Sequence, residues 1–247
     1  MSIRIARSEG VVEITLDRPE KRNAMTDAMW AQLEAHLASI DPASGDRVLV
    51  ITGAGEAFCG GSDVDGLLDD LPSLPARIDV SNRCVLAMRE LPIPTIAKVD
   101  GIAAGSALNL ALACDLLYAS DRARFAQLFV HIGLSVDSGA SWLLPRLVGE
   151  RKARELCLLG EQVSAADALA IGMISKVVPA AELAATVAEV ASRLAGYNPA
   201  ALAGTKRMVN QTWQLDLAGA LRAETSNQVA VIRTDHARTL IERFTRR

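Results

Sequence analysis

The chain has 247 residues, half of them apolar and only 4% aromatic, with a formal net charge of −3. This length allows one α/β core with a helical appendage, and the charge leaves no basic field for nucleic acid. The polar start MSIRIARSEG lacks the apolar core of a secretory signal, and no apolar run reaches the ~18 residues of a membrane helix. Four cysteines and three histidines are scattered without ligand spacing. We therefore expect a cytoplasmic protein with reduced thiols, no metal and no membrane partner.

Strands and helices alternate through the first half of the chain. Apolar runs have the character of buried parallel strands, and Thr26 is placed to cap a helix. This alternation is typical of parallel crossover units. In chain order we expect strands at residues 3–6 and 11–17, a helix at 26–39, a strand at 48–52, helices at 63–68 and 74–90, a strand at 95–99, a helix at 106–113 and a strand at 116–119.

From Ser138 onward the pattern is nearly all helical, apart from a short strand expected at residues 174–178. Residues 180–194 and 199–213 have the apolar periodicity of amphipathic helices. The change in pattern near residue 190 predicts two regions. They are an α/β core over residues 1–190 and a C-terminal helical region over residues 191–247.

Three glycine-containing segments follow predicted strands. Gly53-Ala-Gly55 begins like a nicotinamide-dinucleotide fingerprint, but Phe58 stands where the third glycine belongs, and no helix is predicted to start there. The segments 58–63 and 101–109 each have a structural explanation, a tight turn or the close packing of a helix. Since they lie on successive strand-to-helix turns, the two together could also offer convergent backbone N–H groups, which is the arrangement of an oxyanion hole.

These segments, in this order, resemble the crotonase (enoyl-CoA hydratase/isomerase) family over nearly the whole chain. The resemblance implies a crotonase-like α/β fold of repeated ββα units, with a C-terminal helical region that mediates assembly into homotrimers or dimers of trimers. It also implies an acyl-CoA thioester substrate, with coenzyme A as part of the substrate and no separate cofactor. The five matching segments are residues 16–25 (LDRPEKRNAM), 58–63 (FCGGSD), 101–106 (GIAAGS), 126–147 and 235–247.

By the same resemblance, the backbone N–H groups of Ser62 and Ser106 would hold the thioester oxygen. They would stabilise the charge that develops there when a proton leaves the neighbouring carbon. Hydration, isomerisation, decarboxylation and hydrolysis all create this charge, so the two amides do not distinguish between these reactions. Asp63 and Asp65 also suit the start of the helix expected at 63–68. The substrate-binding positions implied along the CoA, pantetheine and acyl chain are Arg22, Ala24, Gly60, Asp63, Val64, Asp65, Ala104, Gly105, Asn109 and Phe129.

The acid–base residues depart from those of the hydratases in this family, which use two glutamates to hold and activate water. Here the first position is Asn109 and the second is Phe129. An amide does not accept a proton at neutral pH, and a phenyl ring has no site for one. Hydration by the two-glutamate route is therefore disfavoured.

A different carboxylate lies in the segment Ile132-Gly-Leu-Ser-Val-Asp-Ser-Gly139. It resembles the I-G-L-x-P-D-x-G segment of the phenylacetate-pathway and related enoyl-CoA isomerases, with Val136 in place of the proline. The resemblance implies that Asp137 shuttles the proton, and apolar neighbours could raise its pKa and make it a better base. The alternative is that Asp137 only caps a helix at 138–147. His131 is expected to be a packed histidine.

The leading hypothesis is an enoyl-CoA double-bond isomerase of fatty-acid or phenylacetate-type catabolism, with Asp137 as its proton shuttle. One alternative is an enoyl-CoA hydratase with an atypical site. Another is a non-catalytic acyl-CoA-binding homologue that kept the oxyanion hole and lost the glutamates. The nicotinamide-binding interpretation of Gly53-Ala-Gly55 is a fourth possibility.

Overall fold

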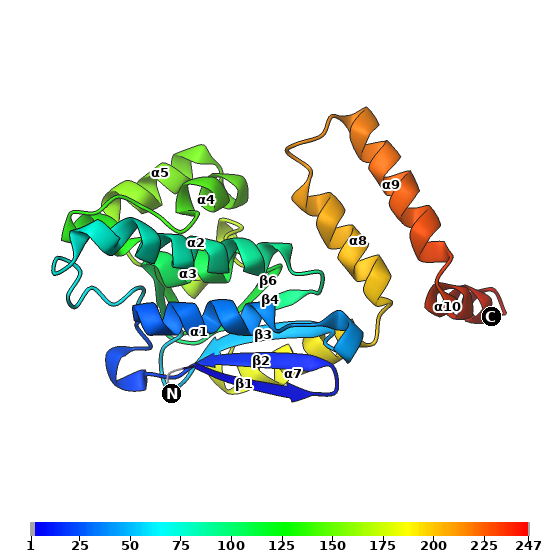
Figure 1. The fold of residues 1–247 in the computed structure, drawn as a ribbon, viewed down its shortest axis with the longest axis horizontal. Helices are drawn as coiled ribbons and strands as arrows, with labels where there is room; N and C mark the ends of the chain where they lie inside the picture. The colour runs from blue at the N-terminus through cyan, green and yellow to red at the C-terminus, as the bar shows by residue number, and fades with distance from the viewer. Residues whose placement is uncertain (1–2, 247) are drawn as a thin grey trace.

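A computed structural model describes residues 3–246, and two β-sheets organise them (Figure 1). In the six-stranded sheet the order is β1-β2-β3-β4-β6-β9, with β1 antiparallel at one edge and every other pair parallel. Its strands are β1 (Ile3–Ser8), β2 (Val11–Leu16), β3 (Val48–Gly53), β4 (Thr95–Val99), β6 (Leu116–Ser120) and β9 (Lys176–Val178). A smaller sheet, in the order β5-β7-β8, joins β5 (Ile102–Ala104), β7 (Arg124–Ala126) and β8 (Val163–Ser164).

Helices cover both faces of the larger sheet, which explains why its strands are apolar on both sides. Strand β3 shows this directly, because Leu49 and Ile51 pack in the core beneath α1, α2 and α3, whereas Val48 and Val50 pack against α7. The alternation of β3 side chains between two cores follows from the two-residue period of a strand. These four helices are α1 (Asp27–Ala38), α2 (Leu74–Glu90), α3 (Gly105–Leu112) and α7 (Leu183–Ala195).

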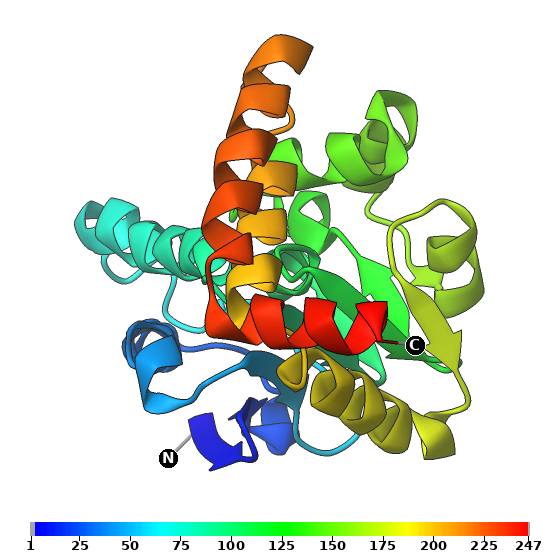
Figure 2. The ribbon, with the colours of Figure 1, turned by 90° about the vertical axis from the view of Figure 1, so that its right-hand side faces the viewer.

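The remaining helices lie beside this layered body. The three C-terminal helices form a group of their own, with α8 and α9 side by side and α10 across one end (Figures 1 and 2). The largely buried Lys206 of α8 anchors the group, because its Nζ lies 2.8 Å from Asp115 Oδ2 and donates to the carbonyl of Ile93. The division at residue 190 stays a prediction. The helices beside the layered body are α4 (Ala140–Val148), α5 (Glu150–Leu159), α6 (Ala165–Ala170), α8 (Pro199–Asn210), α9 (Leu217–Ile232) and α10 (Asp235–Thr245).

Short 3₁₀ turns join several of these elements. They are Pro19–Lys21, Pro42–Ser44, Leu71–Ser73, Leu128–Ile132 and Ala180–Glu182. Within residues 3–246, no helix is both long enough and apolar enough to cross a membrane.

Two predicted helices differ from the structure. No helix forms at 63–68, where residues 65–68 are turns, because Gly66 takes a left-handed conformation (φ 70°) and the Asp63 carboxylate pairs with Arg18. The expectation that Asp63 and Asp65 start a helix was therefore wrong. The helix expected from Ser138 begins only at Ala140, since Ser138 (φ 48°) and Gly139 (φ 83°) are both left-handed.

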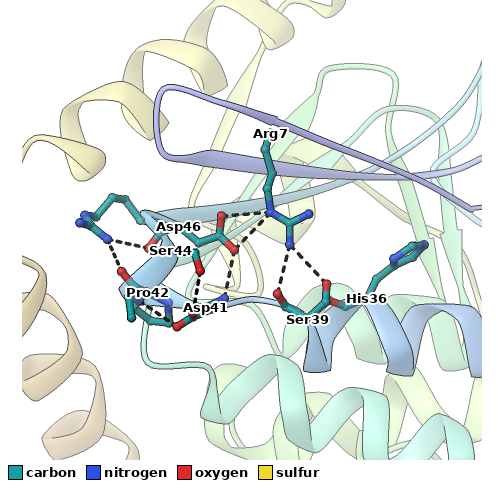
Figure 3. A network of polar contacts seen from close by, with 9 residues as sticks. Arg7, His36, Ser39, Asp41, Pro42, Ser44 and Asp46 are labelled. Atoms are coloured by element: carbon teal, nitrogen blue, oxygen red, sulfur yellow. Dashed lines mark hydrogen bonds and ion pairs between the residues drawn. The ribbon is translucent and has the colours of Figure 1, made fainter.

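A polar network fixes the edge hairpin to the connection between α1 and β3 (Figure 3). Arg7 Nε donates to Asp46 Oδ1 at 3.1 Å, and Arg7 Nη2 donates to the Ser39 carbonyl at 3.2 Å. The buried Asp46 carboxylate also accepts from the Asp41 amide at 3.1 Å. Because every partner belongs to the scaffold, we assign this network to stability rather than to chemistry.

Candidate active site

A cavity of about 510 Å³ opens between the start of α1, the turns after β3, the N-terminus of α3 and the loop before α4. It brings together Ser62, Ser106 and Asp137, the three residues predicted to act in catalysis. A larger hollow of about 690 Å³, between α2, α4 and α8, is lined by none of the predicted site residues. The predicted substrate-binding residues that line the smaller cavity are Gly60, Asp63, Val64, Gly105 and Phe129.

Backbone hydrogen bonds hold the segment that carries Ser62 between two neighbours. On one side, the Met25 amide donates to the Gly61 carbonyl, and the Asp63 amide donates to the Met25 carbonyl, both at 2.8 Å. On the other side, Cys59 pairs with the β5 strand through the Ile102 carbonyl and the Ala104 amide, both at 3.0 Å. Since β5 leads directly into α3, these bonds set the spacing between Ser62 and Ser106.

Two glycines make this close approach possible. Gly61 has φ 109°, and a Cβ there would lie 3.2 Å from the Ala104 carbonyl oxygen. Gly105 has φ 53° and opens α3, so Ser106 is the second residue of the helix. Amides in the first turn of a helix have no partner within the helix and lie at the positive end of its dipole. The Ser106 amide is therefore suited to an oxyanion.

Hydroxyl groups occupy the space between the two segments. The Ser62 amide donates to Ser106 Oγ at 3.0 Å, and the two serine Oγ atoms lie 2.8 Å apart. From α1, Trp30 Nε1 donates to Ser62 Oγ at 3.1 Å. An oxygen acceptor thus already stands at hydrogen-bond distance from the Ser62 amide. No local sequence pattern links residues 30, 62 and 106, so this trio was not predicted.

Asp137 lies in the loop between Leu128–Ile132 and α4, and it lines the cavity. Its Oδ1 atom is buried and has no hydrogen-bond partner among residues 3–246. Burial raises the pKa of Asp137 above its ordinary value, and a hydrogen bond from the Ser138 side chain opposes part of that rise. The alternative that Asp137 caps α4 is not supported, because the N-cap is Gly139 and no side chain caps the helix.

The other two carboxylates that line the described part of the cavity are paired. Asp27 Oδ2 lies 2.7 Å from Arg77 Nε, and Asp63 pairs with Arg18. The Arg18 hydrogen bond, together with one from the Asp65 amide, holds the pKa of Asp63 below its ordinary value. Asp137 therefore differs from both in having a buried carboxylate oxygen without a hydrogen-bond partner among residues 3–246.

The two positions at which hydratases carry glutamate have other roles in this structure. Asn109 is fully buried, donates to the Asp137 carbonyl at 3.0 Å and accepts from Gln127 Nε2 at 2.7 Å. It does not line the cavity, and it fixes the backbone of Asp137 instead. Phe129 presents its ring to Gly105, where a Cβ would lie 3.7 Å from Phe129 Cζ, and so forms an apolar wall beside the oxyanion segments.

The remaining predicted substrate-binding residues lie outside the cavity lining. The Arg22 carbonyl accepts from the Gly60 amide at 2.8 Å, which places this exposed arginine beside the cavity. Asp65 is exposed and pairs with Lys21 at 3.2 Å, Ala104 is buried, and Ala24 is partly buried. Contacts of these four residues with a ligand stay predictions.

His131 is not the packed histidine that we expected. It is exposed on the cavity wall, with Nε2 3.1 Å from the Leu159 carbonyl oxygen. The dinucleotide interpretation of Gly53-Ala-Gly55 lacks its structural context, because β3 leads into turns and no helix starts at its end.

Comparison with known families gives a match over nearly the whole chain. Residues 6–247 match the family described as enoyl-CoA hydratase/isomerase. A 1,2-epoxyphenylacetyl-CoA isomerase of Escherichia coli is 38% identical over 207 residues, which are 82% of this chain and 79% of that protein. A Rhodobacter capsulatus protein named as a probable enoyl-CoA hydratase is also 38% identical, over 83% of this chain and 80% of its own length.

A solved structure gives the same result for the fold. A Thermobifida fusca protein in complex with acetoacetyl-CoA superposes with a TM-score of 0.87 at 32% identity, covering 93% of this chain and 94% of that one. The crotonase-like fold expected from the sequence is thereby confirmed.

Proposed function

The chain belongs to the enoyl-CoA hydratase/isomerase family, and on that premise we propose that it is an enoyl-CoA isomerase that moves a 3,4 double bond into conjugation with the thioester. The observation that carries the proposal is the state of Asp137. Among the cavity carboxylates within residues 3–246, it alone has a buried oxygen without a hydrogen-bond partner, and burial raises its pKa. Such a group is suited to accept a proton at neutral pH.

A double-bond shift needs one base and no water. Asp137 removes a proton from C2 of the acyl chain, and the negative charge moves onto the thioester oxygen. The Ser62 and Ser106 amides stabilise that charge as it develops. Asp137 then returns the proton to C4, two carbons away, so that the atoms of the substrate are conserved and the product is the conjugated 2-enoyl thioester.

Hydration has less support at this site. Adding water across a double bond requires groups that hold the water and accept its proton. The Asn109 side chain is fully buried and bonded to Asp137 and Gln127, while Phe129 offers only an apolar ring. The same absence of a water-binding pair favours the proton shift.

The relatives support an acyl-CoA substrate and leave the reaction to experiment. One similar protein is named an isomerase of a CoA thioester and another a probable hydratase, at equal identity. We propose that coenzyme A is bound as part of the substrate, with Arg22 and Ala24 beside its path and the segment 62–65 beside the pantetheine and acyl chain. Fatty-acid or phenylacetate-type catabolism is the proposed setting.

The test is the rate at which a trans-3-enoyl-CoA becomes conjugated, followed by its ultraviolet absorption. We expect Asp137→Asn to lower kcat by about 10³-fold, because the amide cannot take the proton, within the usual range of 10²–10⁴ for general acid–base catalysis. The matched control is Asp27→Asn, which removes a cavity carboxylate that is already paired with Arg77. The control should stay within about threefold of the parent, since the proposed reaction assigns no proton transfer to Asp27.

Other outcomes would identify the alternatives. Full activity of Asp137→Asn would rule out the shuttle. Water addition to a trans-2-enoyl-CoA would indicate a hydratase with an atypical site. Tight binding of acyl-CoA without turnover of either substrate would indicate a non-catalytic homologue.

We also propose that the chain assembles into trimers, or dimers of trimers, through its C-terminal helices. These helices and the turn between α8 and α9 expose large apolar side chains, including Trp213 (69%), Leu217 (76%) and Phe244 (81%). Large apolar side chains left exposed along one group of helices are expected where subunits make contact. Light scattering should give a mass of three or six chains, and a monomer at micromolar concentration would contradict the proposal.

A further inference from the structure

Three side chains from distant parts of the sequence form a hydrogen-bonded chain beside the two oxyanion amides. Trp30 Nε1 donates to Ser62 Oγ at 3.1 Å, and Ser62 Oγ lies 2.8 Å from Ser106 Oγ. Trp30 is 2% exposed and Ser106 is 3% exposed, whereas Ser62 is open to the cavity. The chain therefore runs from the core beneath α1 to the cavity.

The direction of these hydrogen bonds follows from the chemistry of the groups. An indole N–H is a donor only, so Ser62 Oγ must accept from Trp30. Ser106 Oγ already accepts from the Ser62 amide at 3.0 Å. The two serines have two hydroxyl hydrogens, and the bond between their oxygens uses one of them. One hydroxyl hydrogen thus stays available to an acceptor in the cavity.

We propose that the Ser106 hydroxyl is a third donor to the thioester oxygen, in addition to the backbone amides of Ser62 and Ser106. In this structure, Ser106 Oγ accepts from the Ser62 amide. When a thioester oxygen binds, it replaces Ser106 Oγ as the acceptor of the Ser62 amide. The Ser106 hydroxyl then rotates and donates to the thioester oxygen. The donors then point one way, from Trp30 through Ser62 and Ser106 to the thioester oxygen.

This arrangement has two physical consequences. Hydrogen-bonded chains polarise one another, so the fixed donor at Trp30 strengthens the hydroxyl donor at Ser106. The effect is larger where the surroundings are poor in water, and both Trp30 and Ser106 are almost fully buried. Trp30 and Ser62 are thus positioning residues for the Ser106 hydroxyl. The proposal rests on acyl-thioester binding in this cavity and does not depend on which reaction follows.

The test measures the thioester carbonyl in a substrate that cannot isomerise. Saturated butyryl-CoA with and without ¹³C at C1 is bound to each variant, and isotope-difference infrared spectroscopy gives the carbonyl stretch. Hydrogen bonds lower this frequency. We expect Ser106→Ala to reverse part of the downshift, and Ser62→Ala, which keeps its amide, to reverse less. Trp30→Phe, which keeps an aromatic ring but removes the N–H, should give a smaller change in the same direction.

Affinity provides a second readout. Ser106→Ala should weaken butyryl-CoA binding roughly fivefold, as expected for one hydrogen bond. The affinity for a thioether analogue, which has no carbonyl oxygen, should not change. The control is Ser192→Ala, an exposed serine on α7 outside the cavity lining, which should match the parent in both measurements. Circular dichroism checks that each variant is folded.

An unchanged carbonyl frequency in Ser106→Ala would overturn the proposal. A larger downshift or tighter binding in Ser106→Ala would also overturn it, since the hydroxyl would then only compete for the Ser62 amide. Because butyryl-CoA has no double bond, these outcomes are independent of the isomerase assay. Asp137→Asn can fail to affect catalysis while the Ser106 result stands, and the reverse is equally possible.

Discussion

The two halves of the active-site cavity are built in different ways. The oxyanion half depends on backbone, because β5, the turn at residues 59–63 and the start of α3 place the Ser62 and Ser106 amides. The acid–base half depends on side chains. Asp137 and Phe129 line it, and other residues at these two positions would give other chemistry. In the proposed mechanism the fold supplies the amides that stabilise an enolate, and a few side chains decide which reaction follows.

The two halves also differ in how well their polar groups are satisfied. In the oxyanion half, Trp30, Ser62 and Ser106 bond to one another in the absence of a ligand. In the acid–base half, Asp137 Oδ1 and Gln127 Oε1 are buried without a partner in the described part of the chain. Buried polar atoms without partners are costly and often mark function. This contrast supports the proposal that Asp137 is the group that takes up the proton.

The largest effect in the oxyanion half should come from removing an amide. Ser106→Pro deletes the N–H, and proline is tolerated in the first turn of a helix because that N–H has no intrahelical partner. We expect kcat to fall about 10²–10³-fold below that of Ser106→Ala, as for other oxyanion donors. Steady-state kinetics of the two variants separates the amide from the hydroxyl, and equal rates would show that the Ser106 amide is not a donor.

The acid–base half should control the pH dependence. Asp137 must be ionised to accept a proton, and burial raises its pKa above the ordinary ~3.9. The value of kcat/KM should therefore be level at high pH. It should fall about tenfold per pH unit once the pH drops below this raised pKa. Asp27→Asn should have the same pH dependence of kcat/KM as the parent protein. If the acidic limb disappears in His131→Gln instead, His131 is the base and the assignment to Asp137 is wrong.

A smaller effect should come from the link between the halves, since Asn109 of α3 holds the Asp137 backbone. Asn109→Leu leaves the Asp137 carbonyl and Gln127 Nε2 without partners in a buried site, which should cost about 1–3 kcal/mol of stability. Because the Asp137 loop loses its anchor, kcat should fall roughly tenfold, a modest share of the acid–base contribution. Thermal unfolding and kinetics measure the two effects, with the exposed Asn82→Leu as control. A loss of stability with unchanged kcat would limit Asn109 to a structural role.

The same contrast explains what the sequence could predict. Long apolar runs predicted the central strands, because residues such as Leu49 and Val50 are buried on both faces of the sheet. Glycine-containing turns predicted where the Ser62 and Ser106 segments approach each other, since Gly61 and Gly105 have conformations that other residues rarely adopt. Both signals are local, so they can be recognised without knowing which distant residues lie close in the folded chain.

Long-range features could not be found in this way. The smaller sheet was missed because β5, β7 and β8 have only two or three residues each. The expected helix at 63–68 was overridden by the pairing of Asp63 with Arg18, 45 residues away in the chain. The roles of Trp30 and Gln127 depend on partners that are distant in sequence. No periodicity or motif records such contacts.

The most direct test of the central claim, that this site moves a proton instead of adding water, is a paired assay on the parent protein. It is mixed with a trans-3-enoyl-CoA and separately with a trans-2-enoyl-CoA, and the ultraviolet absorption of the conjugated thioester is followed. We predict a rise with the 3-enoyl substrate and no comparable fall with the 2-enoyl substrate. A rapid fall with the 2-enoyl substrate, and no rise with the other, would contradict the account and require a water-binding group other than Asn109 and Phe129.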